Sequence, residues 1–168
     1  MLIIDNYLSK LDFNYIINQV SNHLFNWNLV RPNNNSKEDD FQLSHMFVEF
    51  RKELYLNSSS IPFMILQPWI NKNNYKVDLI RAKANCFFKT LKNKQLGYHK
   101  DIENNKNTKT MILYLETSNG YTEFEDNKKI KSVENRIAIF DSYENHQTVT
   151  QTDKFFRKNI NINFNIIN

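Results

Sequence analysis

Two histidines and one aspartate have the residue types and the spacing of a metal-binding site. His99 and Asp101 are separated by one residue, and on a β-strand such positions project to the same face. An imidazole and a carboxylate placed in this way can reach one metal ion. His146 follows 45 residues after Asp101, far enough for several strands to return the chain to the same end of a barrel. The three side chains can then form a 2-His-1-carboxylate triad, which holds iron(II) on one face and leaves its other positions open.

An arginine in the last apolar segment is a candidate for binding an anion. Arg157 lies in FFRKNININF, where apolar and polar residues alternate. An arginine at an inward strand position is costly to desolvate unless an anion pairs with it, and its planar guanidinium fits a carboxylate in two-point fashion. The alternative, an outward arginine on a solvated face, stays open at this level.

The remaining residues that could do chemistry have simpler interpretations. His23 and His45 have no partner at ligand spacing, and we expect both to be structural. Tyr114, taken alone, reads as an ordinary strand aromatic, and Cys86 as a small buried hydrophobe.

The second half of the chain must supply the strands that position these residues. From about residue 76 the pattern has period two, which predicts about eight short strands. The expected strands are 77–88, 96–99, 110–117, 120–126, 129–133, 136–141, 145–150 and 156–165. Asn119-Gly120 suits a two-residue hairpin turn, because both central residues of such a turn need positive φ. Strands spaced so regularly favour a sandwich or barrel, and we expect a double-stranded β-helix, or jelly roll, in an α+β chain.

Helices are expected before residue 76. Apolar residues from Phe13 to Leu24 recur at helical spacing after Ser9, a capping candidate. Residues 31–40 read as a loop, and a second amphipathic helix is expected over 43–54. Pro62 suits the first turn of a third helix. We therefore expect one domain over residues 1–168, with helical support in 1–75 and a jelly-roll catalytic core in 76–168.

Composition limits the setting and the partners. The chain has 168 residues, a formal net charge of +4 and 40% hydrophobic residues, but no apolar run of the roughly 18 residues that a membrane span needs. Its start lacks the pattern of a secretory signal. With Cys86 as the single cysteine, a reducing, cytoplasmic setting is expected. The charge is spread along the chain, which gives no support to membrane or nucleic-acid partners.

Three segments carry a family resemblance by their order. They are GYHKD, TMILYLETSNGYTEFED and ENRIAIFDSYENHQTVTQTDKFFRKNININF. Over roughly residues 76–165 the sequence resembles the iron(II)- and 2-oxoglutarate-dependent dioxygenases, specifically the prolyl-hydroxylase-like branch seen also in viral proteins. The opening IIDNYLS, with Trp27 after the first expected helix, is similar to that family's first segment.

The resemblance implies roles at matching positions. His99, Asp101 and His146 look like the iron ligands, Arg157 and Tyr114 like the residues that bind the distal carboxylate of 2-oxoglutarate, and Asn161 stands where the family often has a small hydroxyl residue near the cosubstrate. Phe87 departs from the pattern, because relatives often have a tyrosine there. Asn85, two residues earlier and on the same face, is expected to supply a polar contact instead.

The activity that the resemblance implies is hydroxylation of an aliphatic carbon, with a peptidyl proline as one substrate candidate. Iron(II), 2-oxoglutarate and dioxygen are the expected cofactors and cosubstrates, with ascorbate as a candidate reductant, and succinate and carbon dioxide the expected coproducts. Segments 89–97 and 102–109 are expected to border the mouth of the site.

Three alternatives remain open from the sequence. The chain can be a jelly-roll binding module without turnover, or the substrate can be a small molecule instead of a peptide or protein. It can also be a nucleic-acid demethylase, but family members of that type carry a second arginine six residues after the first. Here that position is Asn163.

Overall fold

The computed structural model describes residues 1–49, 55–56, 59–103 and 107–167 and consists of two antiparallel sheets and two helices. The large sheet has the order β1-β9-β6-β11-β5-β3-β2, with β4 paired to β3, and the small sheet has the order β10-β7-β8. The strands of the large sheet are β1 (Leu2–Ile4), β2 (Asn28–Val30), β3 (Gln42–Glu49), β4 (Tyr55–Leu56), β5 (Lys76–Phe88), β6 (Thr108–Tyr114), β9 (Arg136–Asp141) and β11 (Phe156–Ile167). Those of the small sheet are β7 (Tyr121–Phe124), β8 (Lys129–Lys131) and β10 (His146–Val149).

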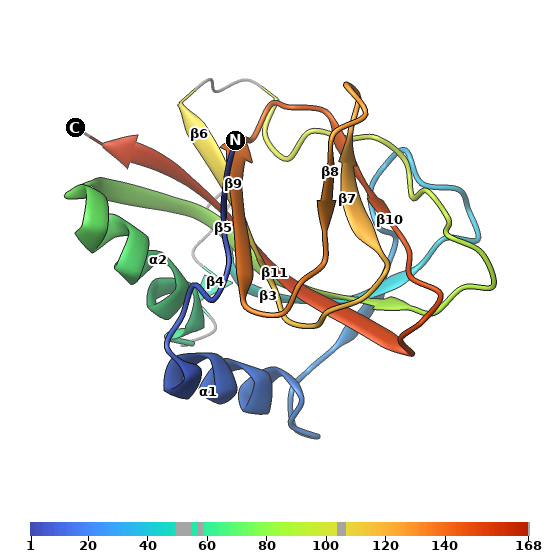
Figure 1. The fold of residues 1–168 in the computed structure, drawn as a ribbon, viewed down its shortest axis with the longest axis horizontal. Helices are drawn as coiled ribbons and strands as arrows, with labels where there is room; N and C mark the ends of the chain where they lie inside the picture. The colour runs from blue at the N-terminus through green and yellow to red at the C-terminus, as the bar shows by residue number, and fades with distance from the viewer. Residues whose placement is uncertain (50–54, 57–58, 104–106, 168) are drawn as a thin grey trace.

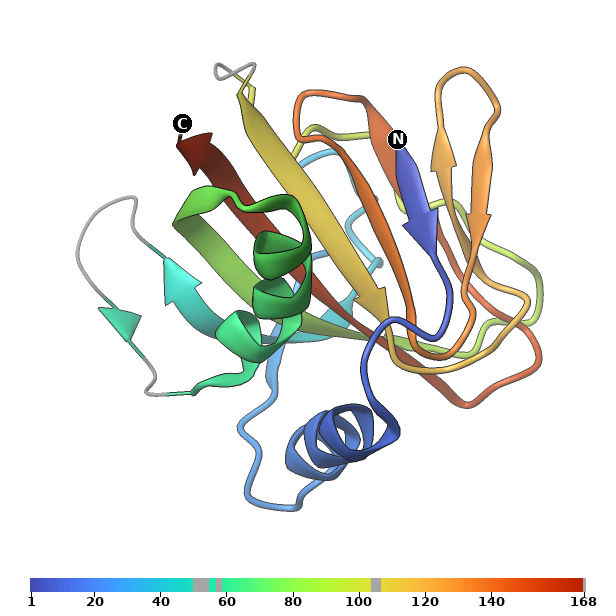
Figure 2. The same ribbon diagram turned by 60° about the vertical axis from the view of Figure 1, so that its left-hand side comes forward.

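The layers follow the expected jelly roll. Helices α1 (Lys10–Val20) and α2 (Ile61–Asn73) lie on one side of the large sheet, and the small sheet lies on the other (Figure 1, Figure 2). A main apolar core fills the space between the helices and the large sheet, and a second cluster, including Tyr114, Phe124 and Phe140, lies between the sheets. Among the described residues, no helix is long and apolar enough to cross a membrane.

Both helices begin where their sequence signals predict. The Ser9 side chain accepts a hydrogen bond from the backbone N–H of Asp12, which caps α1. This helix ends at Val20, so Leu24 lies beyond it and is exposed. Helix α2 has Pro62 in its first turn, as expected, and ends at Asn74, which adopts a left-handed conformation with φ of 53°.

Strands β5 and β11 together carry four buried asparagines, Asn85, Asn159, Asn161 and Asn163. Along β11 the apolar residues Ile160, Ile162 and Phe164 join the main core. The alternate positions face the interior between the sheets, where cross-strand register pairs them with β5: Arg157 with Phe87, Asn159 with Asn85, Asn161 with Lys83 and Asn163 with Arg81. The chain thus forms an inner row, defined as these eight side chains, of which all but Phe87 are polar, opposite an outer face that is apolar along Ile160, Ile162 and Phe164. Cys86, between inner positions of β5, is buried as expected, and burial raises the pKa of its thiol to about 11.

The helix expected over 43–54 is wrong. Residues 42 to 49 form β3, which pairs with β5 and β2; positions 50–54 lie outside the described residues. The register of β3 shifts between Met46 and Val48, so that Phe47 and Val48 are both buried although they are neighbours. This irregularity removes the period-two pattern and imitates helical spacing.

Two further expectations are corrected near the turns. Residues 96–99 form no strand, but Gln95 and His99 make isolated bridges to β10. Seven strands, β5 to β11, therefore follow residue 75 in the described chain, where about eight were expected. Asn119-Gly120 forms no tight hairpin: neither residue has positive φ, and the chain here passes from β6 in the large sheet to β7 in the small one.

Candidate metal centre

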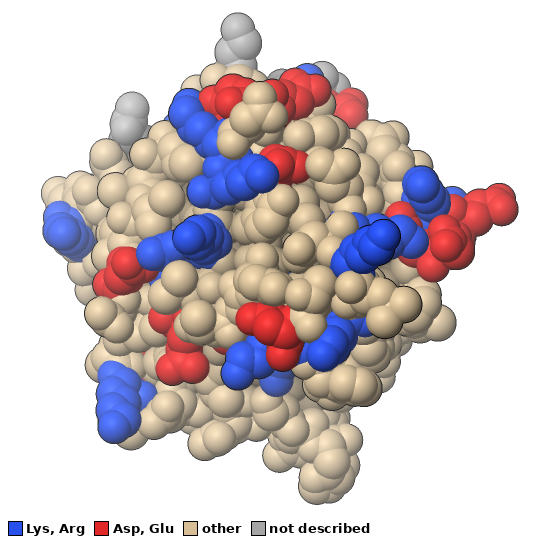
Figure 3. Space-filling view, turned by 45° about the vertical axis from the view of Figure 1, so that its right-hand side comes forward, with Lys and Arg blue, Asp and Glu red and all other residues tan. Residues whose placement is uncertain are grey.

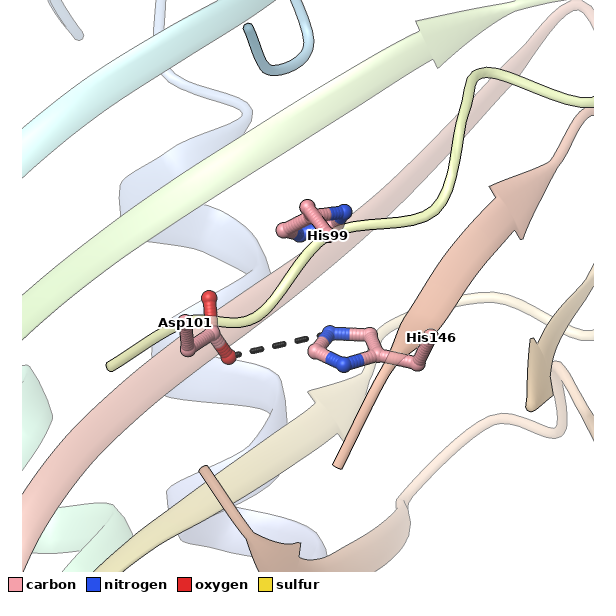
Figure 4. Close-up of side chains that lie close together, drawn as sticks. All are labelled: His99, Asp101 and His146. Carbon is pink, nitrogen blue, oxygen red and sulfur yellow. Dashed lines mark ion pairs between the residues drawn. The ribbon is translucent and has the colours of Figure 1, made fainter. Parts of the chain in front are cut away.

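The three predicted metal ligands converge between the sheets. One potential ligand atom from each of His99, Asp101 and His146 lies within 4.8 Å of the other two. Nε2 of His146 is 3.7 Å from Oδ2 of Asp101, and Figure 4 shows the imidazoles and the carboxylate turned toward a common point. Two imidazoles and one carboxylate that close together fit a ferrous ion held on one face.

Backbone pairing holds the two histidines side by side. The N–H of His99 donates to the carbonyl of His146 at 2.9 Å, and the N–H of His146 donates back at 3.0 Å. This antiparallel bridge leaves the ring centroids 4.6 Å apart. The N–H of Asp101 donates to the carbonyl of Ser142 at 3.0 Å, which ties the third ligand to the end of β9.

Each imidazole has one nitrogen next to a carbonyl and one directed toward the centre. Nδ1 of His146 is 2.9 Å from the carbonyl oxygen of Glu144, and Nδ1 of His99 is 3.4 Å from that of Gly97. Donation from Nδ1–H leaves the lone pair on Nε2 available to a metal. Burial, together with nearby His146, lowers the pKa of His99 to about 4, which keeps its imidazole neutral at neutral pH.

The Asp101 carboxylate is fixed by three side chains. Its Oδ1 accepts from Arg81 at 2.8 Å, and its Oδ2 accepts from Thr110 at 2.9 Å and from Asn161 at 3.1 Å. Burial alone raises the pKa of Asp101, but the positive field of His146, Arg81 and their neighbours outweighs it and holds the pKa well below its usual range. The carboxylate is therefore ionised and already oriented for a cation.

Arg157 lies fully buried on the inner row with an unused donor. Its Nε donates to Gln151 at 3.2 Å and its Nη2 to the carbonyl of Val149 at 3.1 Å, whereas its buried Nη1 has no partner among the residues that the structure describes. The guanidinium carbon lies 4.9 Å from the centre of the Phe87 ring. Burial lowers the pKa of Arg157 to about 10, so the group remains charged at neutral pH. A buried cation with a free N–H fits an anionic partner such as a carboxylate.

Gly120 makes room for this guanidinium. A Cβ at position 120 would lie 2.8 Å from Nε of Arg157 and 3.1 Å from its Cζ. The glycine is thus required by a close approach of a side chain and not by the turn that the sequence suggested.

The other predicted cosubstrate residues line the same interior. The Tyr114 hydroxyl is 2.8 Å from the Thr122 hydroxyl, and burial raises the pKa of Tyr114 to about 12, so the phenol stays protonated. Asn85 donates to Asn159 at 3.0 Å. Asn161 contacts Asp101 through its amide nitrogen, while its buried Oδ1 has no partner in the described part of the chain. Asn85 and Asn161 line a narrow cavity of about 30 Å³ that also touches His99 and His146.

A wider cavity of about 650 Å³ lies at the mouth and shares Asn33, Lys83 and His99 with the narrow one. The described part of segment 102–109 contributes Ile102 and Glu103 to its lining, whereas 89–97 contributes nothing. The opposite wall comes from residues 32–35, which the sequence identified only as a loop. Asn33 donates to the carbonyls of Leu96 and Gly97, which docks that loop beside the ligands.

The structure adds residues that the sequence reasoning did not identify. Arg81, Lys83 and Thr110 surround the ligands, and Gln151 holds Arg157. The alternation in RAKANCFF contains a signal for two of them, because Arg81 and Lys83 share the face of Asn85. His45 instead packs between Phe25 and Phe47, and His23 is exposed; neither approaches the centre.

Comparison with known proteins identifies the fold. No protein-family model matches the sequence, and no curated protein matches it. Solved structures do match: an oxidoreductase of the 2OG-Fe(II) oxygenase family from Burkholderia pseudomallei superposes with a TM-score of 0.70 at 9% identity, over 98% of this chain and 84% of that one. The chain therefore has the fold of the 2-oxoglutarate-Fe(II) oxygenases.

Prolyl hydroxylases are among the similar structures. The viral collagen prolyl hydroxylase of Paramecium Bursaria Chlorella virus-1 gives a TM-score of 0.63 at 15% identity, over 99% of this chain and 96% of that one. A prolyl hydroxylase from Trichoplax adhaerens, solved with a hypoxia inducible factor peptide fragment, gives 0.68 at 14% identity, over 98% and 82%. The resemblance inferred from the sequence is thus confirmed in the fold.

Proposed function

We propose that the chain is an iron(II)- and 2-oxoglutarate-dependent dioxygenase that hydroxylates an aliphatic carbon, with release of succinate and carbon dioxide. The observation that carries this proposal is a convergent His99, Asp101 and His146 cluster in the same interior as a buried Arg157 with an unpaired N–H. A metal triad or a buried arginine alone has many uses, but the two together fit a metal and a dicarboxylate.

Each residue has a definite part in this proposal. His99, Asp101 and His146 would hold iron(II) from one side, which would leave its other side open to 2-oxoglutarate and dioxygen. Bound iron supplies the oxidising chemistry, while the protein orients the reactants and excludes water. Arg157 and Tyr114 bind the distal carboxylate, and Asn161 and Asn85 offer amide contacts nearer the metal. Because the cavity that Asn85 and Asn161 line holds only about 30 Å³, cosubstrate binding requires its lining side chains to move apart.

A peptide is the substrate class we favour, with a prolyl residue as the first candidate. Support comes from the prolyl hydroxylases among the similar structures, one of which was solved with a peptide fragment. The mouth cavity, at about 650 Å³, has the volume of a typical ligand site. A cytoplasmic location and a single domain remain our proposals for the chain as a whole.

Metal binding and turnover test the proposal directly. Manganese(II) and iron(II) binding are measured by calorimetry, and succinate release is measured with iron(II), 2-oxoglutarate and ascorbate, without added substrate. We expect His99→Ala and Asp101→Ala to lose metal binding and turnover, whereas Arg157→Ala mainly raises the 2-oxoglutarate concentration required. His23→Ala is the matched control, because His23 is an exposed histidine away from the centre.

Two outcomes would count against the proposal. Equal metal affinity in wild type and His99→Ala would contradict the assignment of the metal ligands. An unchanged 2-oxoglutarate response in Arg157→Ala would contradict the assignment of Arg157 to the cosubstrate carboxylate. Bound iron without succinate release would instead favour a jelly-roll binding module.

A further inference from the structure

The mouth cavity carries positive charge next to the metal ligands. Its basic lining side chains are Arg81, Lys83 and Lys100, and its acidic ones are Asp101 and Glu103. Asp101 accepts hydrogen bonds from Arg81, Thr110 and Asn161 and is a proposed metal ligand, so its hydrogen-bonding capacity is directed to these groups and not to the lysines. The face in Figure 3 has basic and acidic side chains interspersed and shows no wide basic stripe.

Lys83 has an unusual position for a lysine. It belongs to the inner row, opposite Asn161 on β11, and lines both the mouth cavity and the narrow cavity behind it. Its ammonium group makes no hydrogen bond or ion pair within the described part of the chain. The charged groups in its field are Arg81, Asp101 and Glu49. Lys83 is half-buried; a partly desolvated ammonium without a partner is costly, and an anion that enters the cavity lowers that cost.

Arg81 supplies a second donor that is already held in place. Its Nε donates to Asn163 and its Nη2 to Asp101, both at 2.8 Å. No partner for its Nη1 is found among the residues described, and the side chain is 14% exposed toward the mouth. Two hydrogen bonds therefore fix the orientation of the Arg81 guanidinium, and its Nη1 remains available to donate to a ligand.

The rest of the lining favours a polar group over an apolar one. Asn33, Asn34 and Asn35 form one wall, and Pro32 and Ile102 are the apolar members of the described lining, which includes no phenylalanine, tyrosine or tryptophan. A nucleobase or a lone proline ring would have no aromatic surface to stack on here.

We propose that the substrate carries a carboxylate or phosphate group close to the carbon that is oxidised, and that Lys83 and Nη1 of Arg81 bind this group. The inference rests on the proposed function and narrows its substrate class. In a peptide, the target residue is then itself acidic or phosphorylated, or has such a residue beside it. Charge-assisted hydrogen bonds from two cations in an enclosed site give both affinity and orientation.

Small probes in the manganese-loaded protein test this inference. N-oxalylglycine at saturation occupies the proposed 2-oxoglutarate site, and paramagnetic relaxation by manganese(II) reports how closely the methyl protons of a probe approach the metal. The probes are acetate and methyl phosphate, with acetamide as the neutral counterpart of acetate. We expect anions to bind about tenfold more tightly than acetamide, the ratio that one charge-assisted hydrogen bond provides. The ratio of acetate to methyl phosphate distinguishes the two anion classes.

Three variants identify the group responsible. Lys83→Gln should reduce the preference for anions to near unity, and Lys83→Arg, which keeps the charge, should retain most of it. Lys92→Gln removes the same charge from an exposed position outside the cavity lining and should leave the preference unchanged.

Several results would overturn the inference, each for a different reason. Equal binding of acetate and acetamide would show that the mouth has no anion preference. An anion preference that survives in Lys83→Gln would show that Lys83 is not the group that binds the anion. A loss of N-oxalylglycine affinity in Lys83→Gln as large as the loss of acetate affinity would assign Lys83 to the cosubstrate. Failure of the wild-type protein to bind manganese and N-oxalylglycine at all would overturn the proposed function and this inference together.

Discussion

At the scale of single residues, Gly120 and Arg157 depend on each other. The guanidinium is fully buried, and its Nε lies only 2.8 Å from the position that a Cβ of residue 120 would take. Because Gly120 does not have positive φ, an alanine can adopt its backbone conformation, and the conflict is with the arginine and with the carbonyl of Val149, 3.1 Å from the same Cβ position.

Gly120→Ala is therefore expected to displace Arg157. Overpacking at a buried position costs about 1–3 kcal/mol of unfolding free energy, and the moved guanidinium should bind 2-oxoglutarate more weakly. Urea unfolding and calorimetry with N-oxalylglycine measure the two effects. On an Arg157→Ala background the same glycine substitution should cost less stability. An equal cost on both backgrounds would show that the methyl group does not meet the arginine.

At the scale of elements, the register between β5 and β11 builds the surroundings of the metal. Asn163 pairs with Arg81 across these strands and accepts from its Nε at 2.8 Å, while its own amide donates to Thr110 at the same distance. Arg81 and Thr110 in turn both donate to Asp101. Asn163 is thus hydrogen-bonded to two of the three side chains that orient the Asp101 carboxylate.

Asn163→Ala should weaken metal binding without removing a ligand. Loss of residues that orient metal ligands typically lowers affinity by about 10–100-fold, and manganese(II) calorimetry measures the change. Asn165→Ala is the comparison, because Asn165 lies on the same strand and accepts from Thr108 instead. If both variants bind manganese as wild type does, the orienting role of Asn163 is wrong.

The sequence could predict the residues that we propose as ligands, but it could not predict the side chains that orient them. His99 and Asp101 are neighbours along the chain, and Arg157 lies in a long alternating segment, so local patterns suffice for them. The contact between Arg81 and Asn163 depends on the register of two strands 82 residues apart, which no local pattern fixes. The helix predicted over 43–54 was wrong for a related reason: the register shift in β3 at Phe47 hides the alternation of apolar and polar residues that is typical of a strand.

At the scale of the whole molecule, the large sheet lies between the main apolar core, which stabilises the fold, and the proposed metal site. The helices cover its outer face with apolar residues such as Ile16, Ile65 and Leu66, all fully buried. The small sheet, whose strand β10 carries His146 of the proposed site, lies on the opposite side (Figure 2). Substitutions in the helical layer should therefore affect folding more than binding.

Leu66→Ala tests this separation. Removing a fully buried leucine side chain costs about 2–5 kcal/mol, so the urea midpoint should fall, whereas the affinity for manganese and N-oxalylglycine at low urea should stay unchanged. Leu24→Ala, at a side chain that is 79% exposed, should alter stability by less than about 0.5 kcal/mol. A parallel loss of cosubstrate affinity in Leu66→Ala would show that the two faces are coupled.

The bridge between His99 and His146 has a mechanical consequence. His146 belongs to β10 of the small sheet, whereas Asp101 is anchored through Arg81 and Asn161 to strands of the large one. An ion bound by all three side chains would link the small sheet to the large sheet. Metal loading should therefore slow amide hydrogen exchange in β7 and β10 more than in β5. Removal of the ion by a chelator would then loosen the small sheet and leave the large sheet, which packs against the helices, unchanged.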